Sequence, residues 1–159
     1  MAGRALIIGY GNPLRGDDGV GQIAARDLAK RAIGDVEVAV CHQLMPELAA
    51  RIATADVVVF IDAEAGTDPP GSVVFSEVTR GESALPSGLV HGVDPAALLF
   101  MSWKLYGRSP QAFLVTVAGS SFAFREGLSD PVTAALPEII STARRLAAMH
   151  LGEGDVPDE

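Results

Sequence analysis

The residues of this chain that could do chemistry gather in two acidic segments. One is a glycine-rich stretch, residues 11–21, which contains the adjacent aspartates Asp17 and Asp18. The other contains Asp62, which ends the apolar run VVVFID. One aspartate of the adjacent pair is expected to cap the helix that follows it, because a carboxylate at a helix N-terminus accepts free backbone N–H groups. The other aspartate is then available for a second role.

Three histidines add candidate ligands. His150 follows a long helical segment and is interpreted as a residue that compensates the helix dipole. His42 ends a predicted strand, and His91 lies late in a long loop that contains Gly, Ser and Pro. A lone loop histidine is more often solvated than bound to a metal. His91 is a candidate metal ligand only because Asp18 and Asp62 are predicted to lie in the same crevice. Two carboxylates and one imidazole would make an open metal site suited to Ni, Zn or Cd.

Two nucleotide-binding motifs resemble the glycine-rich stretch, and neither fits. Residues 9–11 (GYG) begin like a dinucleotide-binding fingerprint, but Leu14 stands where its third glycine should allow close helix packing. Gly11 and Gly16 have the outer spacing of a phosphate-binding loop, but the aspartates that follow would repel phosphate. The sequence also lacks HExxH and GxSxG, so it predicts neither a common zinc protease nor a serine nucleophile elbow.

The composition is typical of a globular protein. The chain has 159 residues, of which 48% are hydrophobic and 20% charged, enough for one domain with its own core. A net charge of -8 would repel a phosphate-rich partner, so nucleic acid is not expected. The apolar run 5–9 is too short for a signal peptide or a membrane span, so we expect a cytoplasmic protein without membrane binding. Cys41, the only cysteine, is interpreted as a small buried hydrophobe rather than a catalytic thiol.

Strand-like and helix-like segments alternate along the chain. Strands are predicted at 5–10, 36–42, 57–62 and 112–118, those at 5–10 and 57–62 as buried ones, and helices at 19–33, 46–55, 94–106 and 130–150. Residues 72–78 form a further predicted strand, which should run antiparallel at a sheet edge because only a short loop precedes it. Pro137 predicts a kink in the last helix or a later start.

This alternation predicts a three-layer α/β/α sandwich around a mostly parallel, twisted sheet of about five strands. Residues 1–150 are expected to form a single domain, and residues 151–159 an acidic, disordered tail. Ligands of such sheets bind at the carboxyl ends of the strands, where the strand order reverses. Asp18 and Asp62 follow the first and third strands and should therefore share a crevice. The chain from residue 79 to His91 would have to cross back to it, and its extended length allows this.

Several segments together resemble the hydrogenase maturation proteases. They are residues 7–21 (IIGYGNPLRGDDGVG), residues 56–63 (DVVVFIDA), His91 with the helix that follows, and residues 127–132 (GLSDPV). The resemblance implies an α/β/α fold and a metal-contacting trio at Asp18, Asp62 and His91. Family members often carry Glu at the first of these positions.

The same resemblance implies a function. It is that of an endopeptidase that recognises nickel already inserted in the large-subunit precursor of a [NiFe]-hydrogenase and removes the C-terminal extension of that precursor. Nickel would then be supplied by the substrate, with no tightly bound metal in the protease itself. A nickel-dependent protein that checks the precursor without cutting it is the alternative.

Residues 41–48 (CHQLMPEL) depart from the segment common in this family. They are similar to the version in proteases that serve bidirectional, NAD-linked hydrogenases. The resemblance implies that Gln43 and Met45 line the substrate cleft, and Asp17 and His42 are further candidates for it. A strand-to-helix turn with Met45 packed inward is the alternative.

Overall fold

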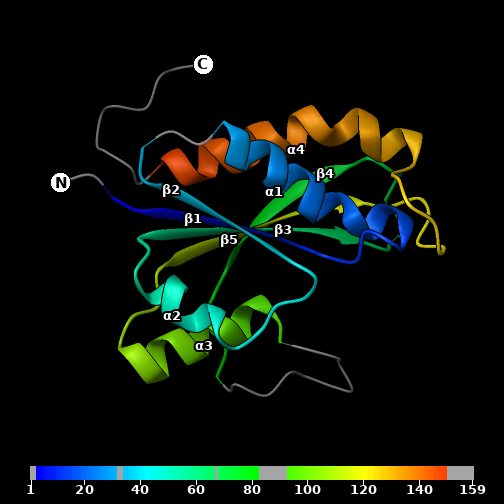
Figure 1. Ribbon diagram of the computed structural model, residues 1–159. Coiled ribbons are helices and arrows are strands. Elements are labelled where there is room, and N and C mark those ends of the chain that lie inside the picture. Colours follow the sequence, from blue (N-terminus) through cyan, green and yellow to red (C-terminus); the bar gives the residue numbers. More distant parts are fainter. Residues whose placement is uncertain (1–2, 32–33, 67, 83–92, 150–159) are drawn as a thin grey trace.

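A five-stranded sheet forms the centre of the protein (Figure 1). The computed structural model describes residues 3–31, 34–66, 68–82 and 93–149. The strands lie in the order β2-β1-β3-β5-β4. Their bounds are Ala5–Tyr10 (β1), Val36–Cys41 (β2), Val57–Glu64 (β3), Val73–Val78 (β4) and Gln111–Ala118 (β5). Neighbouring strands are parallel except for β4, which pairs antiparallel with β5 at the edge.

Helices cover both faces of this sheet. Their bounds are Val20–Lys30 (α1), Leu48–Ala53 (α2), Pro95–Tyr106 (α3) and Asp130–Ala148 (α4), with a short 3-10 helix at Gly16–Gly19 (η1). Helices α1 and α4 lie on one face, and α2 and α3 lie on the other (Figure 1). The predicted three-layer sandwich with one antiparallel edge strand is therefore confirmed.

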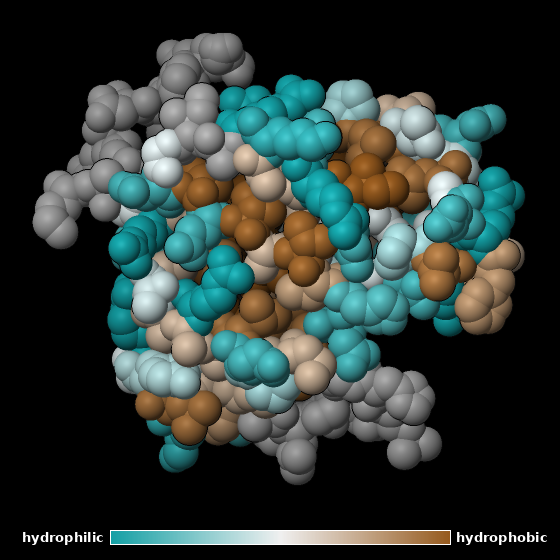
Figure 2. Space-filling view, viewed as in Figure 1, coloured by the Kyte–Doolittle hydropathy of each residue, from teal (hydrophilic) through white to brown (hydrophobic). Residues whose placement is uncertain are grey.

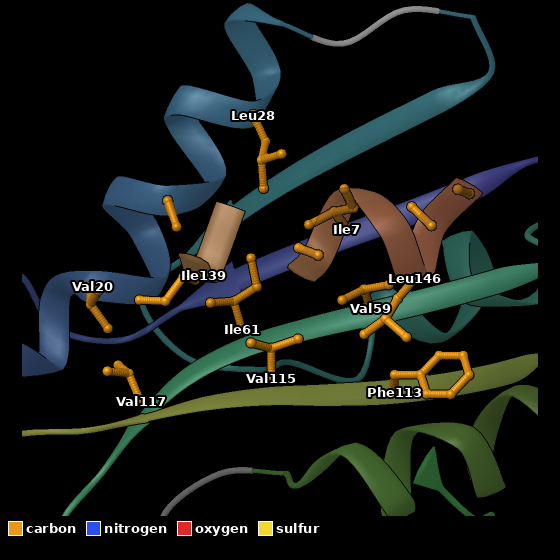
Figure 3. Close-up of a cluster of buried hydrophobic side chains, with 14 of the residues drawn as sticks. Ile7, Val20, Leu28, Val59, Ile61, Phe113, Val115, Val117, Ile139 and Leu146 are labelled. Atoms are coloured by element: carbon orange, nitrogen blue, oxygen red, sulfur yellow. The ribbon is translucent and has the colours of Figure 1, made fainter. Parts of the chain in front are cut away.

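The central strands are apolar along their whole length because both of their faces are covered. Successive side chains of β1 and β3 point to opposite faces and enter two separate cores. The core under α1 and α4, drawn in Figure 3, includes Ile7, Val59, Ile61, Val115, Leu28, Ile139 and Leu146. The core under α2 and α3 includes Leu6, Ile8, Val58, Phe60, Ile52, Leu98 and Leu99.

The ends of some elements differ from the prediction. Helix α4 runs without interruption through Pro137, so the predicted late start is wrong. Pro137 is exposed, and the loss of one backbone hydrogen bond there leaves the buried face of the helix intact. Strand β3 continues past Asp62 to Glu64, because β5 pairs with it as far as Ala118.

The start of α3 agrees with the prediction. Asp94 is its N-cap and accepts the backbone N–H of Ala97 at 2.8 Å, and Pro95 occupies the first turn. The predicted acidic tail, His150 and most of the loop between β4 and α3 lie outside the described residues. Among the helices that the structure does describe, none combines the length and the apolar character that a membrane crossing requires.

Candidate active site

A crevice opens where the strand order reverses, between β1 and β3. Its volume is about 620 Å³, and it lies at the carboxyl ends of the parallel strands. Asp18, from the loop after β1, and Asp62, from β3, both line it. The start of α3 contributes Asp94 to the same lining. The topology thus brings together Asp18 and Asp62, which lie far apart in the sequence, at the edge where open α/β sheets bind ligands.

Asp62 is a half-buried carboxyl group in this crevice. Its Oδ1 accepts the backbone N–H of Ala63 at 2.8 Å. Burial, with the negative charges of Asp18 and Glu64 adding to it, raises the pKa of Asp62 to about 6, against the opposing hydrogen bonds from Ala63 and Tyr10. A carboxyl group that titrates near neutrality can both accept and return a proton.

Tyr10 faces Asp62 from the last position of β1. Its ring packs edge to face on Phe60, with the centroids 6.5 Å apart and the planes at 86°. Burial and then the carboxylates of Asp62, Asp94 and Asp18 hold the pKa of Tyr10 well above its usual range. The hydroxyl therefore stays protonated and can donate. Sequence analysis did not identify Tyr10 as a site residue. The feature that could have indicated it is a polar hydroxyl at the end of an otherwise apolar strand.

The loop after β1 is shaped to hold Asp18 at the crevice. The carboxylate Oδ2 accepts the backbone N–H of Asn12 at 2.8 Å. Gly11 has a φ of 142°, and a Cβ there would lie 1.9 Å from the carbonyl oxygen of Asp18. Only glycine allows this closure. Neither η1 nor α1 has a side-chain cap, so the predicted capping role of the aspartate pair is wrong.

Asp17 points away from the crevice and is fully buried, with 0% exposure. Its Oδ1 accepts the N–H of Ser129 at 2.7 Å. Its Oδ2 accepts the N–H groups of Ser120 and Ser121, at 2.7 and 3.0 Å, and the hydroxyl of Ser129 at 2.8 Å. Burial alone would raise the pKa of Asp17, but these hydrogen bonds outweigh it and lower the pKa. Its prediction as a cleft residue is therefore wrong: it ties η1 to the β5–α4 loop.

The N-terminus of α1 is packed directly on the strand ends below the crevice. A Cβ on Gly21 would lie 2.5 Å from the carbonyl oxygens of Ile61 and Tyr10, so only glycine permits this approach. The buried side chain of Gln22 donates through Nε2 to the carbonyl oxygens of Gly11 and Cys41, at 2.8 and 3.0 Å. The walls of the crevice are therefore fixed by buried contacts before any ligand binds.

Solved structures share this architecture. No protein-family profile matches the sequence, and no curated protein matches it. The hydrogenase-maturating endopeptidase HybD from E. coli is 25% identical, with a TM-score of 0.71 over 92% of this chain and 91% of that one. The [NiFe] hydrogenase maturation protease HybD from Thermococcus kodakarensis is also 25% identical, with a TM-score of 0.66 over 91% of this chain and 99% of that one. The chain is similar in sequence and fold to these hydrogenase maturation endopeptidases, and like them it is a peptidase.

A third solved structure supports the fold assignment. The [NiFe] hydrogenase maturation protease HycI from Thermococcus kodakarensis KOD1 is 22% identical, with a TM-score of 0.71 over 92% of this chain and 94% of that one.

The segment after β2 lies beside the crevice. His42 and Gln43 line it, and they also line an adjoining hollow of about 580 Å³ to which Met45 contributes. Met45 is 41% exposed, so the alternative in which it packs inward is wrong. Cys41 ends β2 half-buried, and burial raises the pKa of its thiol, as expected of a small hydrophobe rather than a reactive thiolate.

The structure describes the positions of two of the three residues in the metal-contacting trio that the resemblance implies. Asp18 and Asp62 line the crevice, whereas His91 lies outside the described residues. Among residues 3–31, 34–66, 68–82 and 93–149, no group of three or more His, Cys, Asp or Glu side chains is arranged to hold a metal ion. The structure also brings Glu64 and Thr116 to the crevice.

Proposed function

We propose that this protein is the endopeptidase that removes the C-terminal extension of a nickel-loaded [NiFe]-hydrogenase large-subunit precursor. The observation that carries the proposal is that Asp18 and Asp62 line one open crevice at the switch point of the sheet. The fold around them is that of solved maturation endopeptidases. Nickel belongs to the substrate in this proposal, and the protease needs no tightly bound metal of its own.

The charge of the crevice favours a cationic centre in the substrate. Among the described residues of its lining, the carboxylates of Asp18, Asp62, Glu64 and Asp94 outnumber the one arginine, Arg15. Carboxylate oxygens and an imidazole are ligands that nickel accepts. His91 is the proposed third contact, and Val93, two residues later in the sequence, lines the crevice.

Asp62 and Tyr10 are proposed to handle protons during cleavage. The nickel of the substrate can polarise a carbonyl group or a water molecule as a Lewis acid. The carboxylate of Asp62, through an oxygen that does not contact nickel, can take a proton from the attacking water and return it to the leaving amine. Tyr10, held protonated, donates to that carboxylate and keeps it oriented. In this proposal Asp62 is the general acid and base, so the protein would be an aspartic-type peptidase.

Incubation with nickel-loaded precursor, followed by mass spectrometry, tests this proposal. The wild-type protein should release the extension as a peptide. Asp18→Ala, Asp62→Ala and His91→Ala should lose release by at least about 100-fold, since contacts that act in the transition state contribute several kcal/mol. Glu138→Ala, on the exposed face of α4, is the matched carboxylate control and should process normally.

Two outcomes contradict the proposal. Full processing by all of the site variants would show that Asp18, Asp62 and His91 are not needed for cleavage. A stable complex of wild-type protein and precursor, with no peptide released, would instead favour the nickel-dependent checkpoint protein. Asp18→Glu adds an informative variant, because it keeps the charge and has the side chain frequent in the family, so it should retain much more activity than Asp18→Asn. Localisation in the cytoplasm stays a prediction of the sequence.

A further inference from the structure

Two loops at the mouth of the crevice form an exposed surface of unusual composition. It consists of Leu14, Arg15, Phe124 and Arg125, here named the rim platform. Phe124 is 85% exposed and Leu14 is 52% exposed, although both lie on ordered loops. Apolar atoms stand among hydrophilic ones at the right-hand edge of Figure 2, where Figure 1 places the loop between β5 and α4. Covering these two neighbouring apolar side chains with a partner would be favourable, because it removes apolar surface from water.

We propose that the rim platform is the docking surface for the folded body of the precursor, next to the segment that enters the crevice. This inference rests on the proposed function. It assigns binding energy mainly to Leu14, Phe124 and Arg125, which do not line the crevice and so do not take part in bond cleavage.

The platform is rigid before binding. The N–H of Arg125 donates to the carbonyl of Leu14 at 3.0 Å, and the N–H of Gly16 donates to the carbonyl of Arg125 at 2.9 Å. Arg15 Nε donates to the carbonyl of Phe122 at 3.3 Å. The buried carboxylate of Asp17 anchors both loops from below. A surface ordered in advance loses little conformational entropy on binding, and phenylalanine and arginine are both enriched at protein interfaces.

The platform is continuous with the candidate active site. Arg15 belongs to both, because it lines the crevice and its guanidinium carbon lies 5.9 Å from the centroid of the Phe124 ring. A precursor that places its C-terminal segment in the crevice would bring the adjoining part of its surface over Phe124. Short peptides of the tail alone would not reach it.

The charge of the platform specifies the chemistry of the partner. The guanidinium of Arg15 lies near the Phe124 ring and Arg125 follows Phe124 in the sequence, in a chain whose net charge is -8 and whose crevice is rich in carboxylates. The complementary surface is therefore an apolar recess bordered by carboxylates on the precursor. Such pairing would orient the precursor, with its cationic metal centre toward Asp18 and its acidic border toward Arg15 and Arg125.

Steady-state processing of nickel-loaded precursor tests the inference. Phe124→Ser should raise KM by about tenfold or more and leave kcat within about twofold, because loss of a hot spot weakens docking without touching the site. Arg125→Glu should raise KM at low salt, with an effect that shrinks as salt is added. Phe75→Ser is the matched control: Phe75 is 55% exposed, lies on β4 and should keep the wild-type KM.

The controls separate failure of the inference from failure of the proposed function. Thermal unfolding of each variant should match that of the wild type, as expected for exposed side chains. If the wild type processes the precursor and both platform variants retain its KM, the docking surface is refuted while the proposed function stands. A fall in kcat without a rise in KM would also refute it. If the wild type itself releases no peptide, both proposals fall.

Discussion

The carboxylate of Asp17 accepts hydrogen bonds from both donors of Ser129, its backbone N–H and its hydroxyl. Its Oδ1 accepts the backbone N–H at 2.7 Å and its Oδ2 accepts the hydroxyl at 2.8 Å. Ser129 is the N-cap of α4, whereas Asp17 lies in η1 immediately before Asp18. The contact therefore joins the helix on one face of the sheet to the loop that carries a candidate active-site carboxylate. Adjacent aspartates thus have different tasks, one structural and one facing the ligand.

Replacing Asp17 should cost stability, whereas replacing Asp18 should not. Asp17→Ala leaves buried N–H groups of Ser120, Ser121 and Ser129 without an acceptor, which should lower the free energy of unfolding by about 3 kcal/mol or more. Asp18→Ala removes one hydrogen bond at a partly exposed site and should cost about 1 kcal/mol or less. Urea denaturation of both variants checks this, and equal losses would contradict the division of roles.

The contribution of Asp17 should vanish in acid. Its pKa is lowered in the folded protein, so the unfolded chain takes up the proton more readily. The stabilisation is fully present above the unfolded pKa of about 4 and is lost as the pH falls through the folded value. The difference in unfolding free energy between wild type and Asp17→Asn should therefore be larger at pH 7 than at pH 3. A difference that does not change with pH would show that the charge of Asp17 contributes nothing.

Asp62 should show the opposite dependence. Its pKa is raised to about 6, so the folded protein binds the proton more tightly and loses stability as the pH rises from about 4 to 6. Asp62→Asn cannot ionise and keeps an acceptor for the N–H of Ala63. The metal-free variant should be more stable than the wild type at pH 7, by on the order of 2 kcal/mol, with the gain disappearing near pH 4. Glu138→Gln is the exposed control, and an equal gain there would refute the assignment to Asp62.

Much of the fold was predictable because it depends on local patterns. The runs ALIIGY and VVVFID are apolar on both faces, and they become the central strands β1 and β3. Asp94-Pro95 marks the start of α3 because capping and a fixed φ act within one turn. The antiparallel direction of β4 followed from the length of the loop before it. The shared position of Asp18 and Asp62 followed from the general rule for strand ends in such sheets.

The remaining site residues depend on contacts across the chain that no local pattern reveals. Nothing near Asp17 indicates that its partners are Ser120, Ser121 and Ser129, more than a hundred positions away in the sequence. The capping role predicted for the pair failed for that reason, because a local hydrogen bond was assumed where long-range ones form. Tyr10 was missed because its phenol is significant only beside Asp62, on the neighbouring strand.

Close packing of α1 on the strand ends gives the last prediction. A Cβ at Gly21 would lie 2.5 Å from the carbonyl oxygens of Ile61 and Tyr10, and these belong to backbone that cannot shift alone. Gly21→Ala should therefore push α1 away from β1 and β3 and lower the free energy of unfolding by about 2 kcal/mol or more. Gly66→Ala is the control, since a Cβ there meets nothing within 4 Å. Because α1 also holds Gln22 against Gly11, the first variant should lose processing activity even at temperatures where it stays folded. Normal stability and activity of Gly21→Ala would show that the helix does not fix the crevice.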